Sequence, residues 1–395
     1  MNKKKPFIIF CLVCLFLFYC STEQIGIEDN LQSFEIRILS PENLGSEKDL
    51  LPADTNTIIF QVKALGSKGE DPYKITKDLS LYLNFGGKST FIKTIKITGG
   101  ISAEERVEVT NIYGKAHIMV ADDQGDMPSY AAGSSEEIYF RNPSIDNIQK
   151  SSMGGPPFSS DMAGYRVNIR GQRNNIGRMV VTAVTNTGFY ITDLASNLNP
   201  PPSLFVYNFS RPYGIYRYQM LCSLTGGVQE HLGDTQITFP DWLTYEDCKI
   251  IDSLQCQICL AELKEYEGKN NIEPYKLTTQ TTYDKTLMEA LESSLVVIEN
   301  ATIMNMFESA YDRDTYIDYG QYKVRLNDTT ASATLLVISR DNVSDFDPSK
   351  YIGKTFSYVR GILTELNFGS TNSMWIVNVR DKYDICIEGY CPKKN

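Results

Sequence analysis

The chain has 395 residues, of which 42% are hydrophobic, and it contains 24 Tyr and 18 Phe. This is enough apolar material for packed cores, and at roughly 100–200 residues per domain it predicts two to four domains. The formal net charge is −10. Proteins that coat nucleic acids non-specifically are basic, because they depend on attraction to the phosphate backbone. A net negative charge opposes this attraction, so the composition excludes that class of protein.

Residues 1–19 have the pattern of an export leader. A basic head at 1–6 precedes an apolar run of 13 residues at 7–19, which is too short for a bilayer that needs about 20 residues. Cys20 closes the run, and the polar residues 21–24 follow. This arrangement resembles the lipobox of bacterial lipoproteins, which implies that Cys20 is acylated and becomes the first residue of the mature chain. The alternative is an ordinary secretory peptide.

The lipobox resemblance implies a protein held at the cell envelope by its lipid anchor. Residues 20–32 would form a tether, and the lack of an acidic residue at Ser21 and Thr22 resembles sorting to the outer membrane. The mature chain would have 376 residues, with 35 basic against 48 acidic side chains and a net charge of −13. No second long apolar segment follows in the sequence, so the acyl chains alone would hold the protein.

Residues 33–142 alternate apolar and polar side chains in short runs, which predicts the strands of an antiparallel β-sandwich. The segment 114–125 and the closing run 137–140 resemble bacterial Ig-like domains. The expected strands are Phe34–Leu39, Thr57–Ala64, Leu79–Phe85, Phe91–Ile97, Val107–Thr110 and Gly114–Ala121. The Gly-, Pro- and Ser-rich residues around 150–160 indicate a linker, which we place at 143–163.

An internal repeat follows the linker, with five strands per copy in the same order and with similar spacing. The first copy is Met179–Val184, Gly188–Asp193, Ser203–Tyr207, Tyr218–Gly227 and Asp234–Phe239. The second copy is Ser294–Glu299, Gly320–Arg325, Ala333–Ile338, Gly353–Gly361 and Met374–Asn378. Five strands with a glycine late in the fourth match the small Greek-key barrel of the oligonucleotide/oligosaccharide-binding (OB) fold.

The segments 353–361 and 381–384 resemble the OB-like domains that are attached to secreted bacterial nucleases. This resemblance implies a first OB-like barrel at residues 164–243 and a second at 291–395. The expected fold is therefore all-β: an Ig-like sandwich followed by two OB-like Greek-key barrels, with a short helical, cysteine-rich insert at 244–290.

The insert contains the best helical candidate, residues 244–269, where apolar residues recur at three- and four-residue steps. Six cysteines lie beyond Cys20, an even number that predicts up to three disulfides in an exported protein. They are Cys222, Cys248, Cys256, Cys259, Cys386 and Cys391. Cys386 and Cys391 form the easiest pair, and we expect the cysteines of the insert to bridge to each other or back to Cys222. A redox or zinc site at 256–259 is the alternative.

The sequence lacks the common catalytic motifs. Its two histidines, His117 and His231, are 114 residues apart, and it has no Gly-rich phosphate loop, G-x-S-x-G elbow or H-E-x-x-H motif. We therefore expect a protein that is not an enzyme and that needs no cofactor or metal. The acidic turns at 122–126 and 312–318 are expected to be solvated, with calcium binding as the alternative.

The first barrel carries the candidate ligand residues. Residues 165–245 hold six arginines against four acidic residues, a local charge of +2, with aromatic residues between them. Single strands need cations for phosphate and rings for base stacking, and the same rings suit the faces of sugars. Alternate aromatics on strands can equally be core. The candidates are Arg170, Arg173, Arg178, Tyr190, Tyr207, Arg211 and Arg217.

These features predict a lipid-anchored cell-envelope protein that acts as a binding or scaffolding module, with the sandwich as its stalk. The expected partners are the membrane, through the lipid anchor, and an extracellular single-stranded nucleic acid, a glycan or an envelope protein. Two alternatives stay open. One is a non-catalytic accessory subunit of an extracellular nuclease or phosphoesterase, and the other is a purely structural envelope protein.

Overall fold

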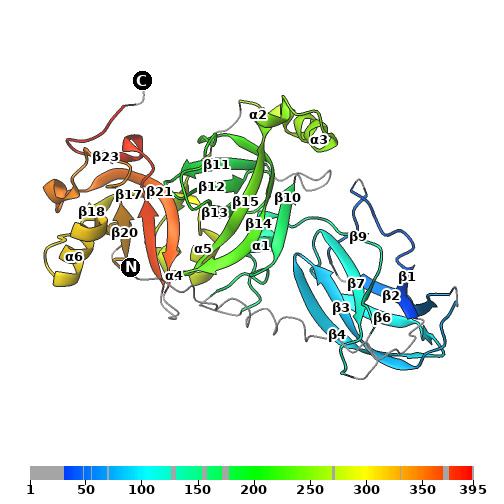
Figure 1. The fold of residues 1–395 in the computed structure, drawn as a ribbon. Helices are drawn as coiled ribbons and strands as arrows, with labels where there is room; N and C mark the ends of the chain where they lie inside the picture. Colours follow the sequence, from blue (N-terminus) through cyan, green and yellow to red (C-terminus); the bar gives the residue numbers. More distant parts are fainter. Residues whose placement is uncertain are drawn as a thin grey trace, which may run out of the picture.

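A computed structural model describes residues 31–47, 49–54, 56–68, 71–125, 130–153, 158–170, 178–268, 272–329, 331–367 and 373–393. The expected leader, Cys20 and most of the expected tether lie outside these residues. The protein is mostly β, as predicted, and its strands form three sheets in chain order that curl into half-barrels (Figure 1). Within the described residues, no helix is both long and apolar enough to cross a membrane.

The first sheet is drawn in blue and cyan in Figure 1. Its order in the described residues is β1-β2-β5-β4-β3-β7-β8, with β6 beside β2 and β9 beside β7. Its strands are β1 (Leu31–Ser40), β2 (Asn56–Gly66), β3 (Lys77–Phe85), β4 (Lys88–Thr98), β5 (Ile101–Ser102), β6 (Glu105–Val109), β7 (Lys115–Ala121), β8 (Gly133–Ser134) and β9 (Ile138–Tyr139). Alternate residues of β2 (Ile58, Phe60, Val62 and Ala64) are 0% exposed. The period-two pattern that predicted these strands therefore also forms the core of the sheet.

The described part of the segment predicted as a linker contacts both neighbouring sheets, and Lys88 Nζ of β4 donates to the Ala163 carbonyl oxygen at 2.8 Å. The segment contains α1 (Ile145–Gln149), whose two isoleucines, Ile145 and Ile148, are buried in the core of the second sheet. Just beyond the segment, the ring of Tyr165 stacks on Phe85 of β3 at 4.7 Å, and Lys88 Nζ lies 4.0 Å from the Tyr165 ring centroid. The junction between the first and second sheets thus has its own stacking and cation–π contacts.

The second sheet has the order β10-β14-β11-β12-β13-β15 in the described residues. Strand β14 pairs with both β11 and β15, so the strands from β11 to β15 form a closed ring of pairings. Strands β13 and β15 are parallel neighbours. Strands β10 and β11 both pair with β14. The strands are β10 (Arg166–Arg170), β11 (Met179–Val184), β12 (Gly188–Asp193), β13 (Ser203–Tyr207), β14 (Met220–His231) and β15 (Asp234–Thr244).

The third sheet repeats this arrangement. Strand β21 pairs with β17 and β22, strands β19 and β20 are antiparallel, and β20 runs parallel to β22. Its strands are β16 (Tyr275–Leu277), β17 (Leu295–Glu299), β18 (Ala301–Ile303), β19 (Gln321–Leu326), β20 (Thr334–Ile338), β21 (Phe356–Leu366), β22 (Met374–Asn378) and β23 (Ile385–Ile387). Each of the ten strands predicted for the repeat overlaps a strand of the second or third sheet, although β14, β15 and β21 extend four or five residues beyond the predicted ends.

The glycine in the fourth strand of each copy has a steric cause. A Cβ atom at Gly226 of β14 would lie 2.8 Å from the Thr238 carbonyl oxygen of β15, and a Cβ at Gly361 of β21 would lie 2.5 Å from the Asn378 carbonyl oxygen of β22. At both places the hairpin partner crosses too closely for any side chain, so glycine is required.

The cysteine-rich insert is helical, but the prediction of one helix over 244–269 was wrong. Strand β15 continues to Thr244, and the helix is divided into α2 (Tyr245–Cys248), α3 (Leu254–Leu263) and the 3₁₀ turn η1 (Lys264–Tyr266). Ile250, between α2 and α3, is 87% exposed. The six cysteines form three disulfides, as predicted. They are Cys222–Cys259, Cys248–Cys256 and Cys386–Cys391.

Three further helices lie around the third sheet. They are α4 (Thr279–Tyr283), α5 (Lys285–Ala290) and α6 (Ala310–Tyr319), with 3₁₀ turns η2 (Pro348–Tyr351) and η3 (Lys382–Asp384). The expectation of an acidic turn at 312–318 was wrong, because this segment is part of α6, which the Ser309 side chain caps by accepting from the Asp312 backbone N–H. A shared apolar cluster joins the second and third sheets. It contains Val180, Tyr190, Met220, Leu295 and Ile362 together with the four cysteines 222, 248, 256 and 259.

Candidate functional site

A row of aromatic rings runs over the outside of the second sheet. On β13, Leu204 and Val206 belong to the core cluster of this sheet, so the alternate residues Phe205 and Tyr207 point to the opposite face. We call Tyr190, Phe205, Tyr207, Phe209 and Phe239 the aromatic row. Successive ring centroids are separated by 4.6, 6.3, 4.6 and 5.0 Å in that order.

The row changes from buried to exposed along its length. Tyr190 is 7% exposed, whereas Phe209 is 55% and Phe239 is 70% exposed. The φ angles of Phe209 and Phe239 are +59° and +49°, in the left-handed region that bulky side chains rarely occupy. Backbone conformations of this kind cost of order 1–3 kcal/mol and gather at ligand sites. The exposed end of the row is therefore the part best suited to a ligand.

The sequence pattern singled out Tyr190 and Tyr207 but missed Phe209 and Phe239. Both missed rings stand next to turn residues: Phe209 lies between Asn208 and Ser210, just after the predicted strand Ser203–Tyr207, and Phe239 is the last residue of the predicted strand Asp234–Phe239 and precedes Pro240. An aromatic residue beside a turn residue, at the end of an alternating run, is the signal that could have identified both rings. Arg211 is exposed two residues after Phe209. In the same connection between β13 and β14, Tyr213 is 98% and Tyr216 is 68% exposed.

The predicted ligand arginines are distributed over several environments. Arg217 Nη1 donates to Asp381 Oδ2 at 2.6 Å, and the guanidinium of buried Arg178 lies 4.3 Å from the Tyr266 ring centroid. Arg170 is half-buried, Arg211 is exposed, and Arg173 lies outside the described residues. Tyr190 lies within the apolar cluster that joins the second and third sheets. The structure thus places Tyr207 and Arg211 near the exposed end of the row, and it does not bring the other described candidates together there.

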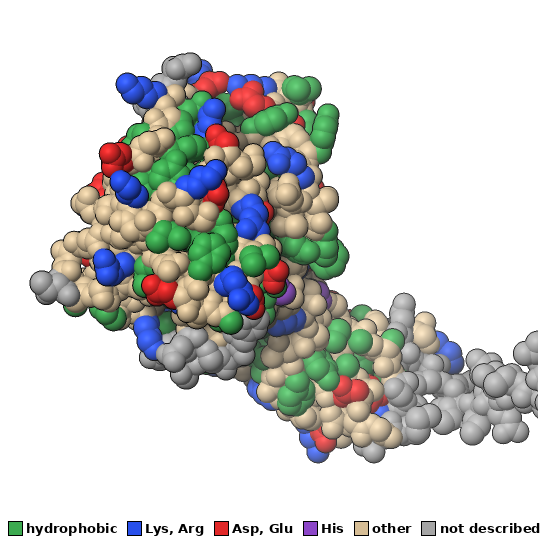
Figure 2. Space-filling model, turned by 90° about the vertical axis from the view of Figure 1, so that its left-hand side faces the viewer, with side chains coloured by type: hydrophobic (Ala, Val, Ile, Leu, Met, Phe, Trp, Pro, Cys, Tyr) green, Lys and Arg blue, Asp and Glu red, His purple; other side chains and the backbone are tan. Residues whose placement is uncertain are grey.

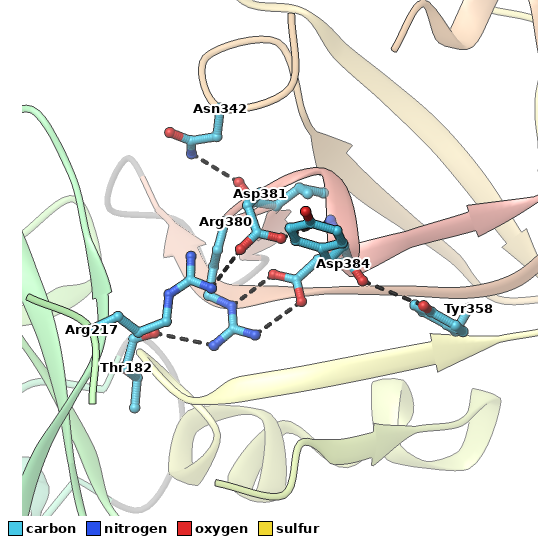
Figure 3. Close-up of polar contacts among 9 residues, drawn as sticks. Thr182, Arg217, Asn342, Tyr358, Arg380, Asp381 and Asp384 are labelled. Atoms are coloured by element: carbon cyan, nitrogen blue, oxygen red, sulfur yellow. Dashed lines mark hydrogen bonds and ion pairs between the residues drawn. The ribbon is translucent and has the colours of Figure 1, made fainter. Parts of the chain in front are cut away.

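Polar contacts fix the second sheet to the end of the third (Figure 3). Arg380 donates to both oxygens of Asp384 at 2.8 and 2.9 Å, and its Nη1 donates to the Thr182 carbonyl oxygen of β11 at 3.1 Å. The Arg217–Asp381 ion pair also crosses this junction. Burial alone would raise the pKa of Asp381, but the hydrogen bond and the charge of Arg217 outweigh it and hold the pKa below its usual value.

Five carboxylates gather at another part of this junction. We call Glu230, Asp234, Glu289, Glu292 and Glu365 the acidic cluster. Asp234 Oδ1 accepts from the Glu365 backbone N–H at 2.8 Å, which links β15 to β21, and Glu292 Oε1 accepts from the Thr235 backbone N–H at 3.0 Å. Gly233 has a φ of +98°, and a Cβ there would lie 2.8 Å from the Glu365 carboxyl carbon, so glycine makes room for this side chain.

Burial dominates the electrostatics of the acidic cluster. It raises the pKa of Asp234 to about 8 and that of Glu289 to about 8, and it raises the pKa values of Glu230, Glu292 and Glu365 as well. The neighbouring carboxylates add to the effect in four of the five groups, Glu365 being the exception. No sequence motif indicates this cluster, because its members are spread from residue 230 to residue 365.

Other sequence candidates have ordinary structural partners. The cysteines at 222, 248, 256 and 259 are held in disulfides that do not join Cys256 to Cys259. They therefore form neither the C-x-x-C bridge of a redox motif nor free thiolates for zinc. In the acidic turn at 122–126, Asp122 pairs with Lys77 at 2.7 Å, and Asp312 of α6 pairs with Lys323 at 2.8 Å. His117 Nε2 shares a hydrogen bond with Asn84 Nδ2 at 3.0 Å in the first sheet.

Comparison of the chain with protein-family models gave no match, and comparison with curated proteins gave none either.

Proposed function

We propose that this chain is a lipid-anchored cell-envelope protein that binds a glycan on the exposed end of its aromatic row, without catalysing a reaction. Cys20 would carry the acyl anchor, and the first sheet would be an Ig-like stalk that holds the remaining domains away from the membrane.

The strand order of the second and third sheets supports an OB-like assignment for both. In the second sheet β11, β12 and β13 are antiparallel neighbours, and in the third sheet β18, β19 and β20 are. A hairpin follows in each sheet: its second strand runs parallel to β13 or β20, and its first strand pairs with β11 or with β17, the strand directly before β18. This order supports an assignment of both sheets to the Greek-key barrel of the OB fold, whose members bind oligonucleotides and oligosaccharides.

The single observation that carries the proposal is the pair of exposed rings at Phe209 and Phe239. Their centroids lie 5.0 Å apart, and both rings are more than half exposed in strained backbone conformations. Exposed apolar groups that the fold does not bury favour a ligand that covers them. The flat, apolar faces of sugar rings stack on such side chains, while exposed Arg211 and Asp241 can serve hydroxyl groups.

Charge favours a glycan over a single-stranded nucleic acid. Arg217 is paired with Asp381, and Arg178 is buried against Tyr266, so two of the arginines that would follow a phosphate backbone are engaged elsewhere. On the side of the third sheet, the face drawn in Figure 2, basic and acidic side chains are also interspersed with hydrophobic ones. A single strand needs a continuous positive groove in addition to stacking rings.

A binding screen tests the proposal. The chain from Ser21 onward is applied to a glycan array and, in parallel, to labelled single-stranded DNA at 20 and 200 mM salt. We expect saturable glycan binding that changes little with salt. Single-strand binding that falls steeply with salt would replace the glycan by a nucleic acid, and binding to neither would contradict the proposal.

A further inference from the structure

Three members of the acidic cluster form a compact group of oxygen donors. Glu289 lies on α5, Glu292 lies in the turn after α5, and Glu365 lies on β21. One carboxylate oxygen of each lies within 4.8 Å of the others. Glu292 is 1% exposed and Glu365 is 5% exposed. Segments more than 70 residues apart in the chain therefore place three carboxylates around one buried point.

Each of the three carboxylates keeps an oxygen that the described residues do not satisfy. The Oε1 atom of Glu292 accepts from the Thr235 backbone N–H and from Gln149 Nε2 at 3.1 Å. The Oε1 atom of Glu365 accepts from Ser373 Oγ and from Asn367 Nδ2. The Oε2 atoms of Glu289, Glu292 and Glu365 are buried without a hydrogen-bond partner among the described residues. The anchored oxygens orient two of the three groups and leave their second oxygens free for a ligand.

The negative charge of this group is not compensated by the described part of the chain. No Lys, Arg or His there forms an ion pair with a member of the acidic cluster, and the charges that act on Glu292 are those of the acidic residues Asp234, Glu289 and Glu230. A buried ionised carboxylate costs several kcal/mol unless it is paired or bound to a metal, and otherwise it takes up a proton, as the raised pKa values of Glu289 and Glu292 describe. A bound cation would displace these protons and compensate the charge.

We propose that Glu289, Glu292 and Glu365 bind a calcium ion at the junction of the second and third sheets. Calcium takes six to eight oxygens at about 2.3–2.6 Å, so the oxygens around one ion lie at most about 5 Å apart, and the three carboxylate oxygens meet this condition. Magnesium keeps several waters and usually binds through one or two carboxylates, so a buried group of three carboxylates favours calcium. Through Glu292 and Thr235 the ion would also stabilise the contact between α5 and β15.

Calcium titration of the chelator-treated full chain tests the site. We expect calorimetry to show one calcium per chain, with a rise in Tm of about 5–10 °C at a hundredfold excess over Kd. Magnesium at the same concentration should raise Tm less.

Two variants locate the ion. Glu292→Gln keeps the shape and removes the charge, so it should lose the bound calcium and its Tm shift, yet unfold at an equal or higher temperature than the native chain in chelator. Asp312→Asn, in the other acidic segment, should keep both effects. Absence of stoichiometric calcium, a response to magnesium alone, or unchanged binding by Glu292→Gln would each overturn the assignment.

Discussion

Removal of the Cys222–Cys259 disulfide should destabilise the second sheet more than removal of any other bridge. This bridge joins β14 to α3 across a sequence separation of 37 residues, whereas Cys386–Cys391 spans only 5. In the chain-entropy account the stabilisation grows with the logarithm of loop length, which gives about 4 kcal/mol for the longer loop and about 2 kcal/mol for the shorter one.

The assay is urea unfolding of Cys222→Ala/Cys259→Ala and, as the control, Cys386→Ala/Cys391→Ala. The ring centroid of Trp242 lies 5.3 Å from that of Phe189 in the second sheet, while Trp375 is on β22 of the third sheet. Fluorescence in a Trp375→Phe background therefore reports on the second sheet alone. We expect the first pair to lose about 4 kcal/mol of unfolding free energy in this signal and the control pair to lose little. Equal losses, or free thiols in the native oxidised protein, would refute the pairing.

Two further predictions concern the anchor and the junction. Cys20→Ala should move the protein from the detergent phase to the aqueous phase, and a variant that still partitions with membranes would contradict the lipoprotein assignment. Arg217→Ala should lower the unfolding free energy by about 1 kcal/mol above pH 5, whereas Arg211→Ala should not. Because the folded pKa of Asp381 lies below the unfolded value of about 3.9, the Arg217 effect should be complete above that value and disappear as the pH falls through the folded pKa. An Arg217 effect that is constant from pH 7 to pH 2 would show that the ion pair is not its source.

The strands were predictable because burial imposes a simple period on them. Strand β12 coincides with the predicted Gly188–Asp193, and β13 with Ser203–Tyr207. The burial of Tyr190 was not predictable, since its face of β12 packs against the third sheet, which no local pattern reports. From the alternating pattern alone, Tyr190 could be either a core residue or a ligand-binding ring.

The helices and the acidic cluster show where sequence reasoning fails. Helix α6 has no buried residue, so hydrophobic periodicity is silent there, although Ser309 before it and Gly320 after it are capping signals. In the insert, the Cys248–Cys256 disulfide holds α2 against α3. A covalent contact of this kind is not visible in the spacing of apolar residues, so the division into two helices was not predicted. The acidic cluster depends on contacts between β15, α5 and β21, and these exist only in the folded chain.

The affinity of Phe209→Ala/Phe239→Ala for the glycan selected by the array tests the central claim most directly. Covering about 60 Å² of each ring at about 25 cal/mol/Å² contributes about 1.5 kcal/mol, so each ring should account for about tenfold in Kd. Phe91→Ala, which removes a ring that is 53% exposed in the first sheet, is the control. The account predicts a loss of about a hundredfold in affinity for the double variant with an unchanged Tm and native affinity for the control. Native affinity in the double variant would contradict it.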